Sequence, residues 1–270
     1  MRFGPAGYPE RSKNPKDAMN IISEMKLDAL EMEYVQGARI SEASAKEIGR
    51  LAKERDIRLS AHAPYFISFN SENPETREKS VAHVINTVRA AHHLGAHIIV
   101  IHAAGYGKNE PSKATDAVIE GLNKCKAIMD DEGIKDVTLG LETMGRASAW
   151  GTLKEISYVM DNIDGIRPVL DVAHVHARYG GSLRTKKDMK ELVDEFFPLA
   201  GDKPHFHISC IEFTDKGEKN HLPLSSADPD MSLLAEVLND HDNDSTFICE
   251  SPLLEADAEV FKNMFPRYKR

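Results

Sequence analysis

Several features that would restrict the class or location of this chain are missing from its 270 residues. It has only three cysteines, widely spaced and without a CxxC pair, which argues against a disulfide framework or a thiolate zinc site. No apolar stretch reaches the roughly 20 residues that span a bilayer. The amino terminus also lacks the apolar core of a signal peptide. We therefore expect a cytoplasmic protein that does not associate with membranes.

Nucleotide-binding motifs are absent, and acidic residues outnumber basic ones. The sequence contains no GxGxxG or Walker motif, so nothing supports an open nucleotide-binding sheet. Its formal net charge of −9 argues against a nucleic-acid partner, because phosphate binding requires lysine and arginine. That argument weakens if bound divalent cations neutralise several carboxylates.

Six short apolar runs carry a histidine, aspartate or glutamate at or near their carboxyl ends. Each run has the composition of a buried parallel strand. The same placement on six successive strands predicts a barrel whose polar side chains converge at one mouth. The polar residues of these runs are His62, His102, Glu142, Asp171, His207 and Glu250.

Strand and helix signals alternate eight times, which predicts a parallel sheet. A (β/α)8 barrel typically needs about 250 residues, so we predict an α/β fold in which residues 1–270 form a single TIM barrel domain. The expected strands are Arg2–Gly4, Ala29–Tyr34, Arg58–His62, His97–His102, Thr138–Glu142, Arg167–Asp171, His205–Ser209 and Ser245–Glu250. The expected helices are Pro15–Met25, Ser41–Arg55, Pro74–Leu94, Pro111–Asp131, Thr152–Met160, Thr185–Phe197 (ended by Pro198), Ser232–Asn239 and Ala256–Phe265.

Loops after the strands build the active site of such a barrel at its carboxyl-terminal mouth. The sequence predicts long loops of this kind at residues 63–73, 103–110, 143–151, 172–184 and 210–231. Two of them add candidate metal ligands: His174, three residues after Asp171, and His221.

Histidine and carboxylate ligands together suit Zn²⁺, Mn²⁺ or Fe²⁺, whereas Mg²⁺ and Ca²⁺ favour oxygen alone. A single histidine at a strand end is more often a hydrogen-bonded residue than a ligand. Several carboxylates held together without cations would repel one another, however, and a metal cluster removes that repulsion. A glutamate such as Glu142 could bridge two metals about 3.5–4 Å apart, as in phosphoryl-transfer sites.

Short motifs around these residues are shared with a known family. They are HAPY (62–65), VIHAAGY (100–106), LETMG (141–145), LDVAH (170–174), HIS (207–209) and ESP (250–252). With these motifs the chain resembles the endonuclease IV family of apurinic/apyrimidinic endonucleases, within the xylose-isomerase-like barrel superfamily. The resemblance covers essentially the whole chain.

The resemblance implies two or three zinc ions. The residues matching the family's ligands are His62, His102 and Glu142 for one ion, and Glu142, Asp171, His207 and Glu250 for a second. A third ion is held in the family by the positions of His174 and His221 and by an aspartate, which is Lys219 here. Asp215 or Glu218 could replace that aspartate, or Lys219 could put a positive charge where the metal would sit.

The resemblance further implies a DNA-repair phosphodiesterase that acts in base excision repair on duplex DNA, cleaving 5′ of abasic sites. A metal-bound hydroxide, positioned by Glu142 and Glu250, would attack the phosphorus. Tyr65 matches an aromatic residue that the family uses near the abasic nucleotide. We expect such an enzyme to be a monomer.

A second interpretation is a sugar isomerase or epimerase with one Mn²⁺-type metal. The four ligands of the second ion alone would suffice, with the two glutamates as a proton-transfer pair. The acidic net charge and Lys219 favour this interpretation, and Glu31 or Glu33 could face the same pocket. Metal stoichiometry separates the two enzymes. A third interpretation, a barrel that only binds a metal or a partner, conflicts with the retention of all six mouth residues.

Overall fold

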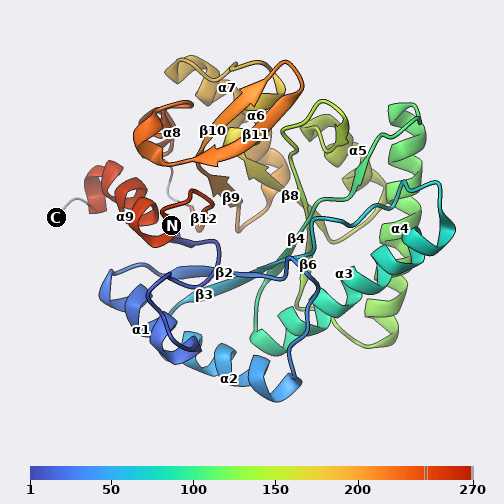
Figure 1. The fold of residues 1–270 in the computed structure, drawn as a ribbon, viewed down its shortest axis with the longest axis horizontal. Helices are drawn as coiled ribbons and strands as arrows, with labels where there is room; N and C mark the ends of the chain where they lie inside the picture. The colour runs from blue at the N-terminus through green and yellow to red at the C-terminus, as the bar shows by residue number, and fades with distance from the viewer. Residues whose placement is uncertain (240, 242, 269–270) are drawn as a thin grey trace.

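Eight parallel strands from along the whole chain form a nearly closed barrel (Figure 1). The computed structural model describes residues 1–239, 241 and 243–268. Around the barrel the strand order is β1-β12-β9-β8-β6-β4-β3-β2, and every paired neighbour is parallel. The strands are β1 (Arg2–Pro5), β2 (Ala29–Glu33), β3 (Arg58–His62), β4 (Ile98–Ile101), β6 (Thr138–Glu142), β8 (Ile166–Asp171), β9 (His205–Ile208) and β12 (Thr246–Cys249). The predicted TIM barrel is therefore confirmed.

The barrel closes where β1 meets β2. The Asp28 amide donates to the carbonyl of Phe3 over 2.9 Å, and the Gly7 amide donates to the carbonyl of Glu31 over 2.9 Å. At this seam the backbones approach so closely that a Cβ at Gly4 would lie 1.7 Å from the carbonyl oxygen of Ala29. The seam therefore requires glycine at position 4.

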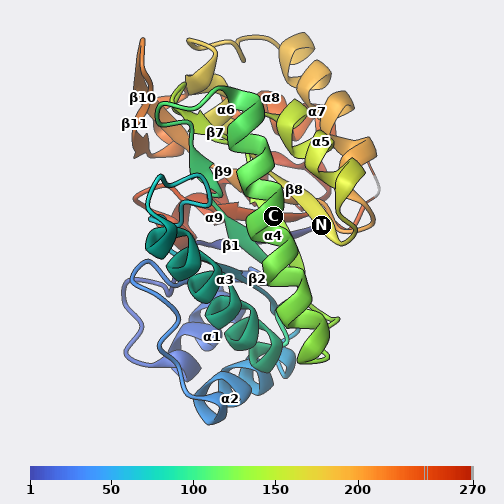
Figure 2. The same ribbon diagram turned by 90° about the vertical axis from the view of Figure 1, so that its right-hand side faces the viewer.

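Helices surround the barrel and cover the outer face of its strands (Figure 2). Helices α3 and α4 have the bounds expected from sequence. The predicted end of the sixth expected helix at Phe197 is wrong, because α7 continues through Pro198 to Ala200 and is followed by Gly201, whose φ is +73°. The helices are α1 (Pro15–Glu24), α2 (Glu42–Lys53), α3 (Pro74–Leu94), α4 (Pro111–Asp131), α5 (Leu153–Asn162), α6 (Val172–Arg178), α7 (Lys186–Ala200), α8 (Met231–Leu238) and α9 (Leu254–Met264). None of the helices in the described residues is long and apolar enough to cross a membrane.

Alternation along the strands separates two apolar regions. On β4, Ile99 and Ile101 join the large core between strands and helices. The alternate residues Ile98 and Val100 form a separate small cluster with Val169 of β8. Period-two alternation places this second cluster inside the barrel. Above it the barrel interior becomes polar, which leaves the carboxyl-terminal mouth for chemistry.

Four of the five segments expected to be loops contain regular structure. Residues 172–184 begin with helix α6, and residues 210–231 form a hairpin of β10 (Cys210–Thr214) and β11 (Gly217–Leu222). The loop prediction was wrong there, because the six-residue β11 and the seven-residue α6 are too short to stand out in sequence. In residues 103–110 and 143–151, the two-residue strands β5 (Ala104–Gly105) and β7 (Ala149–Trp150) pair antiparallel with each other. Figure 2 shows β10 and β11 projecting beyond the barrel, where they extend one wall of the mouth.

Candidate metal centre

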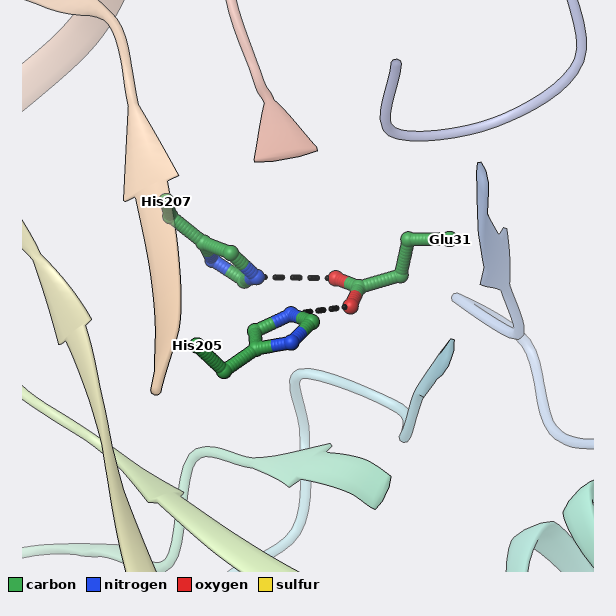
Figure 3. Close-up of side chains that lie close together, drawn as sticks. All are labelled: Glu31, His205 and His207. Carbon is green, nitrogen blue, oxygen red and sulfur yellow. Dashed lines mark hydrogen bonds and ion pairs between the residues drawn. The ribbon is translucent and has the colours of Figure 1, made fainter. Parts of the chain in front are cut away.

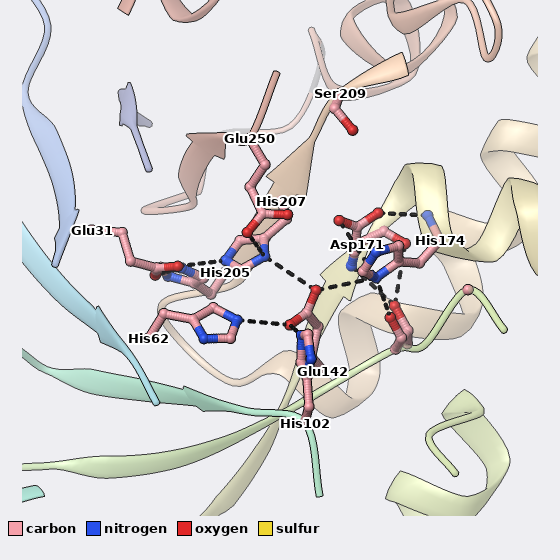
Figure 4. A network of polar contacts seen from close by, with 12 residues as sticks. Glu31, His62, His102, Glu142, Asp171, His174, His205, His207, Ser209 and Glu250 are labelled. Carbon is pink, nitrogen blue, oxygen red and sulfur yellow. Dashed lines mark hydrogen bonds and ion pairs between the residues drawn. The ribbon is translucent and has the colours of Figure 1, made fainter. Parts of the chain in front are cut away.

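The six strand-end residues meet at the mouth of the barrel, as the sequence predicts (Figure 4). These residues lie close together because all eight strands are parallel, so their carboxyl ends are at the same end of the barrel. Most are withdrawn from solvent: Asp171 and His207 have no exposed surface, and Glu142 is 1% exposed. His62, Glu142 and Asp171 end their strands, and His102 and Glu250 directly follow β4 and β12.

Glu142 lies at the centre of this group, and its two carboxylate oxygens face different histidines. Oε2 lies 3.2 Å from Nε2 of His62 and 2.6 Å from Nε2 of His102. Oε1 lies 3.3 Å from Nδ1 of His207 and 3.2 Å from Nδ1 of His174. A carboxylate divided in this way has the arrangement of a ligand that bridges two cations.

Two overlapping sets of donors share Glu142. In each set the ligand atoms lie within 4.8 Å of one another. Nδ1 of His207 is also 3.3 Å from Oε1 of Glu250, which ties the second set together. The sets are His62, His102 and Glu142, and Glu142, Asp171, His207 and Glu250.

The electrostatics of the second set fit a cation. Burial raises the pKa of Asp171 to about 8, and the nearby carboxylates of Glu250 and Glu142 add to the shift. Oδ2 of Asp171 is buried and has no hydrogen-bond partner in the described residues. Burial alone would also raise the pKa of Glu142, but His102 and His207 hold it well below its usual range. A divalent cation would satisfy the orphaned oxygen and keep all three carboxylates ionised.

The two additional histidines lie beside this centre. Asp171, His174 of α6 and His221 of β11 form a third group of donors within 4.8 Å. Asp171 also caps α6, because its Oδ1 accepts from the His174 amide over 2.6 Å. The Ser209 hydroxyl lies 2.8 Å from Nδ1 of His221 and fixes that ring.

Lys219 and Glu218 are adjacent on β11, but their side chains point in different directions. The Lys219 ammonium donates to Glu212 over 2.6 Å on the exposed face of the hairpin, so its charge points away from the centre. Glu218 points inward instead: its Oε2 lies 3.2 Å from Nε2 of His174 and accepts from the Gly145 amide over 3.0 Å. Asp215 is exposed at the hairpin turn. Of the two acidic alternatives, Glu218 is the one placed beside His174.

A pocket of about 260 Å³ opens beside the centre and is lined by Ala6, Glu33, His221, Glu250 and Leu254. Glu33 is therefore a site residue that sequence named only as an alternative. Burial raises its pKa to about 8. Tyr65 lies on the loop after β3, is 67% exposed and packs edge to face against Phe66, so it stands outside the donor sets.

A larger cavity, about 630 Å³, lies at the opposite end of the barrel among the amino-terminal ends of the strands. Two of the arginines that line it are paired with carboxylates: Arg2 contacts Asp56 and Arg58 contacts Asp244. None of the residues that line this cavity belongs to the donor groups found among the described residues, which lie toward the carboxyl-terminal mouth.

Comparison with known proteins agrees with this architecture. A sequence model of the xylose isomerase-like TIM barrel family matches residues 19–264. The chain belongs to this family. It is 28% identical over 267 residues to an uncharacterised protein of Methanocaldococcus jannaschii, covering 97% of this chain and 96% of that one. It is 30% identical over 199 residues to a probable endonuclease 4 of Acholeplasma laidlawii, covering 71% of this chain and 62% of that relative.

Solved structures of two kinds within this fold are equally similar. Endonuclease IV of Thermus thermophilus superposes with a TM-score of 0.77 and 20% identity, covering 99% of this chain and 98% of its own. A D-tagatose 3-epimerase-like protein superposes with a TM-score of 0.76 and 21% identity, covering 99% of this chain and 97% of its own. Identities this low establish the fold, and the choice between hydrolysis and isomerisation depends on the site itself.

Proposed function

We propose that this protein is a metal-dependent phosphodiesterase of the endonuclease IV kind that incises duplex DNA 5′ of abasic sites. The observation that carries the proposal is the pair of histidines on Oε2 of Glu142. His62 and His102 add a second donor set to the four residues that a single-metal isomerase would need. Two adjacent cations are the usual arrangement for phosphodiester cleavage.

The residues of the centre would have different roles in this reaction. Divalent cations held there, which we take to be two zinc ions, would lower the pKa of a coordinated water to about 7 and stabilise the departing oxygen. Glu142 holds the two donor sets at a fixed separation. Glu250, with 17% of its side chain exposed, lines the open pocket and is placed to orient a water that enters it.

Two further observations support a DNA substrate. The curated relatives at about 30% identity include several named as probable endonuclease 4. Tyr65 presents an exposed aromatic ring on the loop after β3, and such a ring can occupy the space left in a duplex by an extruded nucleotide. We further propose that the enzyme acts as a single-domain monomer in the cytoplasm, and that Glu218 helps His174 and His221 to hold any third cation.

A sugar epimerase is the competing function, and one observation favours it. Glu142 and Glu250 belong to one four-residue donor set and approach the same nitrogen of His207, each within 3.3 Å. Two glutamates across one cation can take a proton from one face of a sugar and return it to the other. That enzyme would have no use for the pair His62 and His102.

The test is incision of a duplex oligonucleotide that carries one abasic site, with an intact duplex of the same sequence as the substrate control. We expect chelator-sensitive cleavage of the abasic strand alone, and loss of at least about a hundredfold in rate for Glu250→Gln in metal-replete protein. Unchanged incision by that variant would refute the role of Glu250. No incision by the wild type, together with epimerisation of a ketose, would refute the proposed function.

A further inference from the structure

Glu31 is a buried carboxylate beside the centre that the proposed function does not use. It lies on β2, a strand that contributes no residue to the two main donor sets, and it has no exposed surface. An isolated charge at such depth is costly unless it is paired and hydrogen-bonded. Its partners therefore indicate why it is there.

Three side chains converge on the Glu31 carboxylate (Figure 3). The Ser60 hydroxyl donates to Oε2 over 2.6 Å, from the residue directly opposite on β3. Nε2 of His205 lies 3.0 Å from the same oxygen. Nε2 of His207 lies 2.9 Å from Oε1. Oε2 thus makes hydrogen bonds with Ser60 of β3 and His205 of β9, whereas Oε1 has only the 2.9 Å ion-pair contact with His207 among the described residues.

His207 connects this carboxylate to the candidate metal centre. One ring nitrogen, Nε2, faces Glu31, while the other, Nδ1, lies 3.3 Å from both Glu142 and Glu250 (Figure 4). A neutral imidazole carries hydrogen on only one nitrogen. The Glu31 carboxylate, 2.9 Å from Nε2, favours hydrogen on that nitrogen, which would leave the lone pair of Nδ1 free for a cation.

The same residues could in principle hold a cation of their own, since Glu31, His205 and His207 form a donor group. Oε2 of Glu31 is already hydrogen-bonded to Ser60 and His205, at 2.6 and 3.0 Å, so it is occupied without a cation. Nδ1 of His207 lies on the other side of the ring, beside the carboxylates of Glu142 and Glu250 in the four-residue set.

We propose that Glu31 is a positioning residue that fixes the tautomer and ring orientation of His207, so that Nδ1 faces the cation of the four-residue donor set. This rests on the proposed function only in requiring a cation at that set, and it holds equally for an epimerase. Carboxylates that orient metal-binding histidines in this way typically contribute 10–100-fold to metal affinity.

The first test is Glu31→Gln in the full-length protein loaded with Co²⁺. A glutamine has a single acceptor oxygen and an NH₂ group, so it cannot accept from His205 and His207 on both of its terminal atoms. We expect about a 10–100-fold loss of Co²⁺ affinity at the four-residue set. Chelator competition would measure the affinity, and the Co²⁺ absorption bands would report on the coordination. The set that contains His62 and His102 should keep its affinity.

Ser60→Ala is the matched control, because it removes one donor from Glu31 and leaves the contact with His207. Its loss of affinity should stay below the roughly tenfold lower bound expected for Glu31→Gln. Equal weakening of both donor sets, with a lower melting temperature of the cation-free variant, would mean that Glu31 acts only on the fold. Wild-type affinity at both sets would also overturn the proposal.

A second measurement needs no Glu31 variant. In ¹⁵N-histidine-labelled, Zn²⁺-loaded wild-type protein, the shifts of His207 should show hydrogen on Nε2 and a cation on Nδ1; His207→Gln assigns the signals. The reverse assignment would overturn the proposal even if Glu31→Gln does not fold. Both measurements are independent of substrate, so a failure of abasic-site incision would refute the proposed function and leave this result standing.

Discussion

His102→Ala separates the two candidate enzymes most cleanly. His102 supplies one of the three residues of the donor set that an epimerase would not need, and its Nε2 lies 2.6 Å from Oε2 of Glu142. The four-residue set keeps all its members. Because its side chain is 23% exposed, the substitution leaves only a small, wet cavity and should barely change the stability of the fold.

The expected loss can be worked out from the number of ligands. Even the removal of a group that merely orients a ligand costs about 10–100-fold in metal affinity. Removing one of three ligands should therefore cost at least about a hundredfold at the His62 set, which is about 2.7 kcal/mol. Incision at limiting zinc should fall by at least the same factor, whereas a reaction that needs only the four-residue set should keep its rate.

The assay compares zinc affinity, by competition with a chromophoric chelator, with incision at a fixed free zinc concentration. The control is His92→Ala, the same substitution on α3, where the ring contacts Asp136 over 2.8 Å at the surface. Wild-type zinc stoichiometry and wild-type incision in His102→Ala would refute the reasoning from two donor sets.

Three further predictions concern the fold and its charges. Gly4→Ala should destabilise the protein by about 1–3 kcal/mol, seen in denaturant unfolding, because its Cβ meets the Ala29 carbonyl; an unchanged midpoint would contradict the closed seam. Lys219→Ala should leave incision unchanged because Lys219 pairs with Glu212 at the surface, and a tenfold loss would place the ammonium at the centre. In cation-free protein, burial lowers the pKa of His62 but contact with Glu142 outweighs it, giving about 10. That contribution to stability is complete below pH of about 6.5 and is lost as the pH rises toward 10, which calorimetry on chelated protein should follow as a falling melting temperature.

The strands could be predicted from sequence because a parallel barrel buries both faces of each strand. Strand β3 and strand β6 have the expected bounds, and β4 is shorter by one residue at each end. His97 and His102 flank β4 rather than belonging to it. Such boundary residues extend the backbone of the strand but make no strand-pairing hydrogen bonds, so the hydrophobic pattern does not give the exact strand ends.

The ends of helices were less predictable, for physical reasons. Pro198 lacks the amide hydrogen that a position inside a helix normally uses, yet α7 continues through it to Ala200, and Gly201 with its positive φ follows. Helix α6 begins directly after β8 because Asp171 caps it, so one residue serves as strand end, helix cap and candidate ligand. A sequence pattern that assigns each residue one role cannot anticipate this.

The candidate centre was also only partly predictable from the sequence. Its six strand-end residues follow from the common direction of the strands. The network of Glu31, Ser60 and His205 does not, because it depends on the register between strands far apart in the chain. The inward turn of Glu218 and the outward turn of Lys219 likewise depend on a β-bulge between Glu212 and Phe213, which no spacing in the sequence reveals.

The proposed function requires two cations that share Glu142, and counting divalent metal ions per chain tests this requirement most directly. The count would be made by elemental analysis on freshly purified wild-type protein and again after graded chelation, with abasic-site incision measured on the same samples. The account predicts at least two ions per chain and loss of incision when the first is removed. One ion per chain in protein that remains fully active would contradict it.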